Sequence, residues 1–331
     1  MRSSTSPAPI SRSRRSLLLW PLILPLGGRV MARDAASPHD GPHTAAWPRR
    51  AIHITVAYPP GGVSDQIARA LAEVLSADLG VPVVIENKAG ASGTLALDLL
   101  VRRPADGYSL CFVAATAIAL RAHAANSRGV ALRAAVPVAG VMRTPILVVG
   151  TRSLGVDGFA RMVDKARQSP GSVRWATTGE GTTGYAVLDR VRRASRTEIV
   201  HIPYKGGGQQ LLDALAGHFE VLSTNVASAQ LEDIAAGRLV ALAVGAPTRL
   251  KVLPDTPTLA ELGYDDANLD SLFGLFAPPD LPEALADRLN RAVAAALETP
   301  ALQTRLRSMS NLPFEGSANA FAQQVTREAR R

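Results

Sequence analysis

Apolar and polar residues along the chain follow two periods in turn, one typical of strands and one typical of helices. A strand-like run at 52–57 leads into a helix from about Ser64, whose apolar residues recur on one face. Gly80 is expected to end that helix, and further strands are expected at 81–85 and 109–114. Strands that alternate with helices in this way indicate parallel pairing with right-handed crossovers.

The same alternation begins again after Gly171. Strands are expected at 173–178, 198–202, 219–222 and 239–244, with helices between them. Two runs of one pattern predict an α/β protein with two lobes, each a mostly parallel sheet flanked by helices.

Two apolar segments can carry the chain between these lobes. Residues 146–149 lead from the first lobe to the second, and residues 271–277 lead back. We therefore expect residues 51–150 and 271–331 to form the first lobe and residues 151–270 to form the second. The C-terminal part carries an apolar helical stripe, expected to pack on the first lobe, at Leu285, Leu289, Val293 and Leu297.

Residues 1–32 have the features of an export signal peptide. A basic segment precedes a short apolar run, Leu17–Leu26, and small residues near Ala32 offer a cleavage site. The SRRSLLL segment at 13–19 also resembles a twin-arginine signal, so the general secretory and twin-arginine routes both stay open. A basic N-terminus on a cytosolic protein is the alternative. We expect residues 33–50 to be a flexible lead-in and the mature protein to be periplasmic.

The formal charge of +8 is concentrated in this leader. Residues 1–32 carry five arginines and no acid, which leaves 31 basic and 28 acidic residues, a net charge of +3, in the remainder. A nearly neutral mature chain argues against a nucleic acid as partner.

Residue types that carry enzymatic chemistry are sparse. The six histidines show no HExxH or comparable metal-ligand spacing, and no GxSxG nucleophile elbow occurs. The single cysteine, Cys111, lies in an apolar strand and is interpreted as a core residue. We therefore expect no metal, no cofactor and no enzymatic activity, with an exported hydrolase as the least favoured alternative.

One glycine-containing segment matches the sequence of a nucleotide-binding motif. The GEGTTG segment at 179–184 fits the dinucleotide fingerprint, but Tyr204 and Lys205 stand where an acid would bind the ribose. The triple glycine at 206–208 lacks the other Walker positions. Both segments are interpreted as turns.

Four glycine-containing turns follow strands, at 58–65, 86–93, 179–184 and 203–208. In parallel sheets, ligands bind beyond the carboxyl ends of the strands. Each turn precedes a helix whose first amides lack intrahelical partners and carry the positive end of the helix dipole. Glycine leaves that backbone open to a ligand. The turns therefore predict an anion-compatible pocket of main-chain N–H groups between the lobes.

Several side chains near these turns have two interpretations. Asp65 either caps the helix start or contacts a hydroxyl or ammonium group of a ligand. The aromatic side chains of Tyr58, Trp175 and Tyr204 either line the cleft or belong to the core. Lys205 is a cleft charge or a solvated turn residue.

Six segments together resemble the Bug family of periplasmic solute-binding receptors, which serve tripartite tricarboxylate transporters. They occur in the family's order, as YPPGGVSD at 58–65, VIENKAGASG at 84–93, PADGYSL at 104–110, IPYKG at 202–206, LPDTPTLAE at 253–261 and FGLFAP at 273–278. The resemblance implies a two-lobed type II periplasmic-binding-protein fold that closes on a small carboxylate in the cleft between the lobes.

The resemblance also implies that main-chain amides of the first two turns hold a ligand carboxylate. Taken with the turns themselves, it indicates candidate ligand-binding residues in both lobes. Those of the first lobe are Tyr58, Pro60, Gly61, Gly62, Asp65, Gly90, Ala91, Ser92, Gly93 and Thr116. Those of the second lobe are Gly179, Gly181, Thr182, Tyr204, Lys205 and Asn225.

The chain departs from the family pattern at several places. Tyr185 stands where a histidine is usual, Leu272 replaces a tryptophan, and Thr224 replaces an acid. Residues 121–135 lack the usual strand-and-loop segment. These departures bear on the ligand rather than on the fold.

Taken together, these features predict a monomeric periplasmic receptor for a small mono- or dicarboxylate, or an amino-acid-like molecule. Its partners would be membrane transporter subunits. The alternative is a ligand-sensing adaptor whose closed form is read by a histidine kinase.

Overall fold

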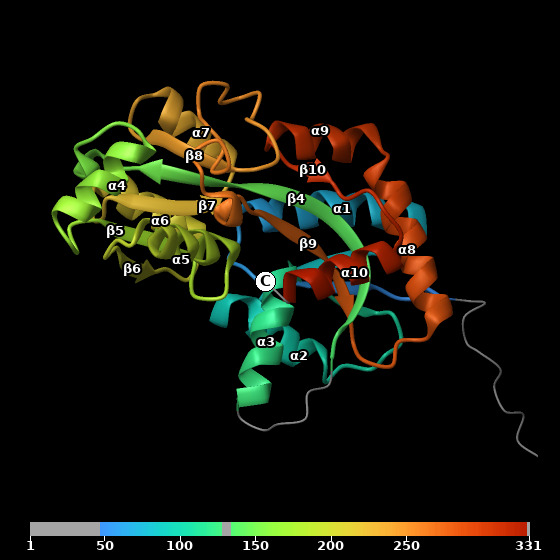
Figure 1. Cartoon of the computed structure of the whole chain (residues 1–331). Helices are drawn as coiled ribbons and strands as arrows, with labels where there is room; N and C mark the ends of the chain where they lie inside the picture. The colour runs from blue at the N-terminus through green and yellow to red at the C-terminus, as the bar shows by residue number, and fades with distance from the viewer. Residues whose placement is uncertain (1–46, 128–133, 330–331) are drawn as a thin grey trace, which may run out of the picture. The chain divides into compact units, whose positions relative to one another are not determined.

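Two β-sheets share one long strand in the computed structural model of this protein, which describes residues 47–127 and 134–329 (Figure 1). The expected signal peptide, residues 1–32, lies outside the described residues, as does most of the expected lead-in. The shared strand is β4 (Val136–Gly150). It changes its neighbours part of the way along, and this divides the described chain into two lobes.

The first lobe is built on one sheet. Besides the first part of β4, its strands are β1 (Ile52–Val56), β2 (Val83–Asn87), β3 (Ser109–Ala114), β9 (Asp270–Ala277) and β10 (Leu312–Pro313). Its helices are α1 (Val63–Leu79), α2 (Thr94–Leu100), α3 (Ala115–Ser127), α8 (Glu283–Leu297), α9 (Pro300–Ser308) and α10 (Ala318–Ala329), with a short 3₁₀ turn at Ala91–Gly93.

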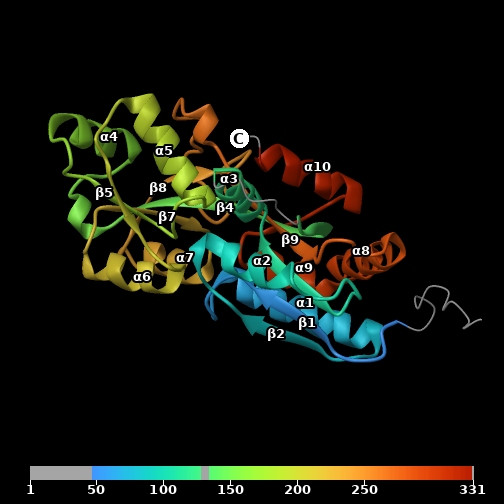
Figure 2. The same cartoon turned by 90° about the horizontal axis from the view of Figure 1, so that it is seen from below.

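The second lobe repeats the same plan. Besides the second part of β4, its strands are β5 (Arg174–Thr177), β6 (Val200–Pro203), β7 (Val221–Asn225) and β8 (Val240–Gly245). Its helices are α4 (Phe159–Gln168), α5 (Thr183–Ser195), α6 (Gly207–Ala216) and α7 (Ser228–Ala235), with 3₁₀ turns at Arg152–Leu154 and Asp265–Ala267. Figure 2 shows α4 and α5 on one side of this sheet and α6 and α7 on the other.

Both sheets are mixed. Strand β1 pairs in parallel with β2 and β3, and β5 pairs in parallel with β6 and β7, as the alternation of strands and helices predicts. Strand β9 is antiparallel to β3 and β4, and the other pairs made by β4 are antiparallel too. Each of these antiparallel pairs involves β4 or β9, the two strands that carry the chain between the lobes.

Strand β4 passes from one sheet to the other near Pro145. Residues 136–145 pair with β9, and residues 146–150 pair with β7 and β8. Proline has no N–H to give to a ladder, which suits the position where the partner strand changes. The Pro145 carbonyl accepts a hydrogen bond from the Val226 N–H, at 3.1 Å, and so ties β4 to the end of β7.

Element boundaries follow local chemistry. Strand β3 occupies the residues expected for it, and α1 ends at Gly80, whose left-handed backbone forms the C-cap as expected. Strand β2 begins at Val83, two residues later than expected, because Pro82 cannot donate to a ladder. The sequence pattern did not predict α3, which runs to Ser127, next to the undescribed residues 128–133.

Helices cover both faces of the first sheet. One core cluster joins strand residues such as Ile54 to residues of α1, α8 and α9, and another joins β3 and β9 to α2 and α10. The C-terminal stripe is confirmed as part of the first of these clusters, since Leu285, Leu289, Val293 and Leu297 all lie in it. Cys111 is confirmed as a buried core residue in β3.

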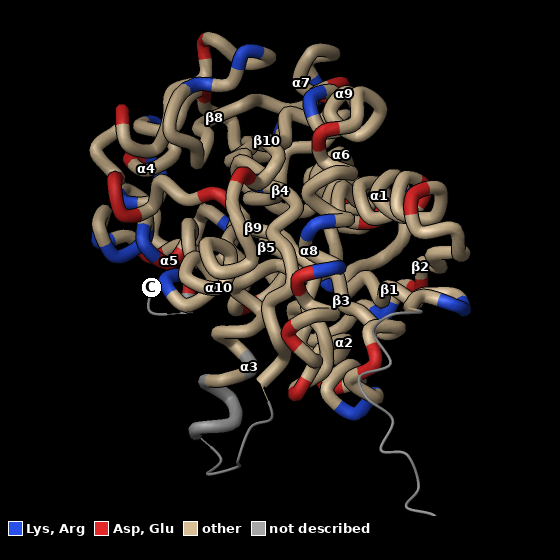
Figure 3. The backbone as a smooth tube through the Cα atoms, turned by 90° about the vertical axis from the view of Figure 1, so that its right-hand side faces the viewer, with Lys and Arg blue, Asp and Glu red and all other residues tan. Residues whose placement is uncertain are grey.

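Among the described residues, no helix combines the length and the apolar character needed to cross a membrane. Basic and acidic residues are interspersed along the chain, as the blue and red positions in Figure 3 show.

Substitution of Leu289 tests the docking of α8. Leu289 is 1% exposed, so Leu289→Ala is expected to lower the free energy of unfolding by about 2–5 kcal/mol in denaturant titrations. The matched control is Leu312→Ala in β10, where the leucine is 55% exposed and the change should stay within about 0.5 kcal/mol. Equal losses in the two variants would contradict the assigned packing.

Candidate functional site

The glycine-containing turns of the two lobes meet one another. A Cβ placed on Gly206 would lie only 2.7 Å from Pro59 Cγ, and one placed on Gly179 would lie 2.7 Å from Ser92 Oγ. The Ser92 hydroxyl donates a hydrogen bond to the Glu180 carbonyl, at 2.5 Å. The four turns predicted to form a site are therefore in contact across the boundary between the lobes.

Helices α1 and α6 begin at this boundary without side-chain caps, as does α2, whose N-cap is Gly93. The N-cap residues are Gly62 for α1 and Gly206 for α6, both with extended backbone, and neither supplies a capping side chain. The first N–H groups of such helices have no intrahelical acceptor, and they carry the positive end of a dipole of roughly half a unit charge. The two helix starts therefore offer main-chain donors suited to an anion.

The backbone at Gly62 is open on its outer side. A Cβ built there would meet only the Pro59 carbonyl oxygen, at 3.8 Å, and the φ of −73° suits any residue. Glycine is thus not required at this position by the fold. Its effect is to leave the backbone of Gly62 itself exposed, directly ahead of the buried first turn of α1.

Asp65 organises the turn before α1. Its carboxylate accepts hydrogen bonds from the Gly61 N–H and from Asn87 Nδ2, both at 2.9 Å. Arg69 pairs with the same carboxylate, at 3.0 Å. Asp65 therefore ties β1, β2 and α1 together, and the Gly61 amide is engaged inside the protein while the amides that follow it start the helix.

The same contacts set the protonation of Asp65. The residue is only 3% exposed, and burial alone would raise the pKa of its carboxyl group. The hydrogen bonds from Arg69, Gly61 and Asn87 outweigh burial and hold the pKa below its ordinary value. Asp65 is consequently an anion at neutral pH.

The turn before α2 has an unusual backbone. Ala91 and Ser92 have φ values of 47° and 53°, and Gly93 follows with 95°. Left-handed conformations in non-glycine residues cost roughly 1–2 kcal/mol each. Such strain is typical of functional turns held by their surroundings. Here a Cβ on Gly93 would approach Val113 to 2.9 Å, so only glycine lets the turn pack this closely.

Tyr58 lies against Gly93 in the turn before α2, and Thr116 follows β3. The Tyr58 hydroxyl accepts a hydrogen bond from the Ala114 N–H, at 3.2 Å, and its ring meets Phe273 edge-on. Burial raises the pKa of Tyr58 above its ordinary value, so its hydroxyl stays neutral. Thr116 lies in the first turn of α3, directly after β3, and is half-buried.

The turn before α5 is capped by its own side chain, unlike those before α1 and α6. Thr182 Oγ1 accepts from the Tyr185 N–H at 3.3 Å and donates to the Gly179 carbonyl at 2.7 Å. Thr177 Oγ1 supports the same turn, since it accepts from the Gly179 N–H at 3.2 Å and lies 2.8 Å from His201 Nε2. The Thr182 hydroxyl is therefore already engaged.

The second-lobe side chains proposed from the sequence differ in their surroundings. Tyr204 donates its hydroxyl proton to Asp213 at 2.7 Å, and burial together with this bond raises its pKa to about 12. Trp175 is fully buried and belongs to the core, the second of its two interpretations. Lys205 is exposed, and the Asn225 side chain accepts from the Ser271 hydroxyl at 2.8 Å.

The three residues that depart from the family pattern are packed in ordinary surroundings. The Tyr185 ring lies 4.8 Å from the His201 ring, and Leu272 is buried in the core under α10. Thr224 Oγ1 lies beneath the start of α6, 3.5 Å from the position of a Cβ on Gly207. An uncharged residue at 224 leaves the positive end of α6 without a buried acid beneath it.

Three residues near the turns were not singled out from the sequence. Asn87 follows a strand directly and Arg69 stands four residues after Asp65, a spacing typical of helical ion pairs, so both had a readable signal. Leu120 had no such signal in the sequence, because its contact with the opposite lobe depends on the fold.

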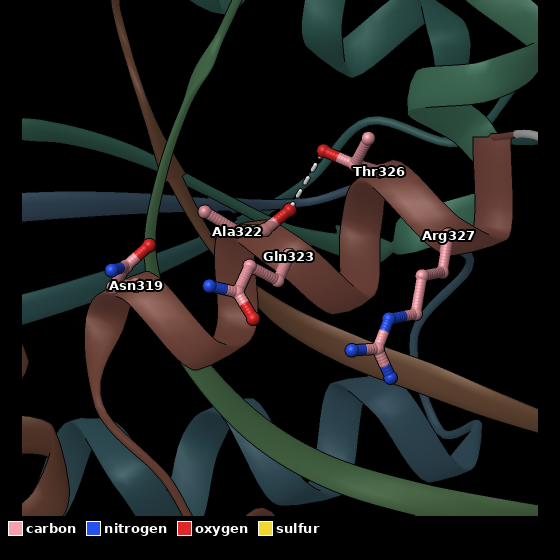
Figure 4. A pocket seen from close by; sticks show the side chains of 5 residues that line it. All are labelled: Asn319, Ala322, Gln323, Thr326 and Arg327. Atoms are coloured by element: carbon pink, nitrogen blue, oxygen red, sulfur yellow. Dashed lines mark hydrogen bonds between the residues drawn. The ribbon is translucent and has the colours of Figure 1, made fainter.

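Two cavities lie away from the turns. One, of about 420 Å³, runs along α10 between Asn319 and Arg327 (Figure 4). The other, of about 1000 Å³, is lined by α5 and the segment from Gly263 to Leu269. Within the part of the chain that the structure describes, no group of three or more His, Cys, Asp or Glu residues is placed to hold a metal ion.

Comparison with known proteins gives consistent matches. The family model for the tripartite tricarboxylate transporter family receptor matches residues 67–331. Protein BugT of Bordetella pertussis is 33% identical over 261 residues, which cover 77% of this chain and 79% of BugT.

Solved structures also match most of the chain. MatC from Rhodopseudomonas palustris, with bound malate, is 26% identical with a TM-score of 0.78, covering 86% of this chain and 98% of MatC. Another R. palustris protein, solved with adipate, is 29% identical with a TM-score of 0.77, covering 86% of this chain and 96% of its own.

Replacement of Asp65 tests its role in holding the first turn. At neutral pH, Asp65→Asn is expected to lower the free energy of unfolding by about 1–3 kcal/mol, because three part-buried hydrogen bonds, from Gly61, Arg69 and Asn87, lose a charged acceptor. The folded-state pKa is depressed, so this contribution is complete above the unfolded value of about 3.9 and is lost as the pH falls through the folded value.

Denaturant titrations of both proteins at a series of pH values measure this difference. The difference in the free energy of unfolding between wild type and variant should be constant near neutral pH and should disappear in acid. The control is Asp78→Asn, at an exposed position of the same helix, with a change within about 0.5 kcal/mol. A gap for Asp65→Asn that persists unchanged in acid would contradict the assigned role.

Proposed function

Because this chain belongs to the tripartite tricarboxylate transporter receptor family, we propose that it captures a small mono- or dicarboxylate between its two lobes. Malate in MatC and adipate in the other R. palustris structure support this class of ligand. The family consists of binding receptors, and we propose that this chain likewise catalyses no reaction.

The observation that carries the proposal is the pair of uncapped helix starts at facing turns. Helices α1 and α6 each begin at a glycine that supplies no capping side chain, and a Cβ on Gly206 would touch Pro59 of the opposite turn. An anion between them would accept hydrogen bonds from both lobes at once. Such a ligand favours the closed arrangement because it makes more contacts there than in an open one.

The candidate residues divide into contacts and supports. We assign direct main-chain contacts to the turns that begin α1, α2 and α6, and to Gly181 in the turn before α5. We assign Asp65 and Tyr58 to support, because the Asp65 carboxylate bonds the Gly61 amide and the Tyr58 hydroxyl bonds the Ala114 amide at the end of β3. Lys205 is exposed beside the α6 turn and adds a positive charge to the site.

We further propose that the mature protein is a periplasmic monomer, exported with cleavage near Ala32, that delivers its ligand to membrane transporter subunits. The family description supports the transporter as partner. Cross-linking in cells followed by mass spectrometry tests this. Recovery of a sensor kinase instead of transporter subunits would assign the receptor to signalling.

A panel of carboxylates tests the class of ligand. At a hundredfold excess over its dissociation constant, a bound ligand should add about 2.7 kcal/mol to the free energy of unfolding, which a thermal-shift assay detects. The matching alcohols and amides, which lack the negative charge, serve as controls. A folded protein that responds to no carboxylate at high concentration would contradict the proposal.

Substitution at Gly62 tests whether the α1 amides bind the ligand. Gly62→Val is expected to leave the fold intact, since a Cβ meets only open space and one oxygen at 3.8 Å. It should weaken carboxylate affinity at least about tenfold, because the side chain blocks approach to the backbone. Isothermal titration calorimetry measures the change.

The matched control is Thr299→Val at the N-cap of α9. That residue also has extended backbone and makes no capping hydrogen bond, and it lies outside the proposed site. Its affinity should equal that of the wild type. Unchanged binding in Gly62→Val would exclude the first turn of α1 as a ligand contact.

A further inference from the structure

Helix α3 touches the turns of both lobes. A Cβ on Gly93 in the first lobe would lie 3.3 Å from Ala117 Cβ, and a Cβ on Gly181 in the second lobe would lie 2.5 Å from Leu120 Cδ2. Thr116 and Leu120 are four residues apart and therefore share one side of the helix. The side of α3 that begins at the candidate residue Thr116 thus ends at a leucine that reaches the other lobe.

The contacts between the lobes form a chain of neighbours. A Cβ on Gly206 would meet Pro59, and one on Gly179 would lie 3.8 Å from the Tyr204 carbonyl oxygen and 2.7 Å from Ser92 Oγ. Gly181, two residues further along the same turn, meets Leu120. The start of α6 and Leu120 are therefore the first and last members of this chain.

The Leu120 contact is tight and apolar. Three of its side-chain carbons lie 2.5–3.0 Å from where a Cβ on Gly181 would be, so the leucine fits only because residue 181 is glycine. The φ of +78° at Gly181 suits glycine as well. A leucine has no donor to offer a carboxylate, and burying an unpaired charge against it is costly.

From these contacts we propose that Leu120 is the wall that limits ligand length, so that the site selects short carboxylates over long ones. This inference rests on the proposed function. A ligand anchored at the amides of α1 and α6 extends toward Gly181 until it meets Leu120. A longer dicarboxylate would press its second charge against the leucine or hold the lobes apart.

Shortening the side chain tests the wall. Calorimetric titration of wild type and Leu120→Ala is performed with straight-chain dicarboxylates from succinate to suberate and with the corresponding monocarboxylates. Wild-type affinity should fall along each series. In Leu120→Ala, the affinity for the longer members relative to the shortest should rise at least about tenfold, the least discrimination that about one methylene group produces in an apolar pocket.

Two further variants complete the design. Leu99→Ala in α2 removes the same atoms from a leucine that is 42% exposed, and it should keep the wild-type length profile. Leu120→Phe enlarges the wall and should steepen the fall in affinity along each series. This variant also provides the test if the alanine variant fails to fold.

The outcomes separate the two proposals. Carboxylate binding by the wild type with one length profile in all variants overturns the wall and leaves the proposed function standing. A folded wild type that binds no member of either series overturns the proposed function and the wall with it. A profile that shifts toward long ligands in Leu120→Ala and toward short ones in Leu120→Phe supports the wall.

Discussion

An α-helix leaves its first amide hydrogens without partners, and a protein normally satisfies them with a capping side chain or with water. Helices α1 and α6 lack a capping side chain, as do α2, α4, α7, α8 and α9, but they begin at glycines whose turns meet between the two lobes. A capping Ser or Asp would contribute about 1 kcal/mol to stability and would occupy the donors. Without such caps, the donors remain open to an anion from outside, and this arrangement is the basis of the proposed site.

The rest of the first lobe makes that open arrangement rigid. Asp65 takes the Gly61 amide and joins it to Asn87 and Arg69, so the turn before α1 is held from three sides. The left-handed residues Ala91 and Ser92 are kept in place by close packing around Gly93. A site built from main chain cannot adjust through side-chain rotamers, so its geometry depends on these supports.

Much of this fold could be read from the sequence, because its strands and helices have clear periods and their turns contain glycine. The parallel pairing of β1 with β2 and β3, and of β5 with β6 and β7, follows from the alternation of strands and helices. The antiparallel roles of β4 and β9 could not be read, since pairing between distant segments leaves no local pattern. Helix α3 escaped prediction because its alanine-rich sequence has no apolar face that stands out.

The candidate site shows the same division. The positions of the turns were predictable from glycine after strands. The partners of Tyr58 and Asn225 were not, since Ala114 and Ser271 reach them only through the register of the sheets. The role of Leu120 could not be predicted either, because its neighbour Gly181 belongs to the other lobe.

A crystal structure of the mature protein with a bound carboxylate is the most direct measurement. We expect one carboxylate group to accept hydrogen bonds from peptide nitrogens in the first turns of both α1 and α6. A carboxylate held by arginine or lysine side chains elsewhere, with those nitrogens bonded to water alone, would contradict the account.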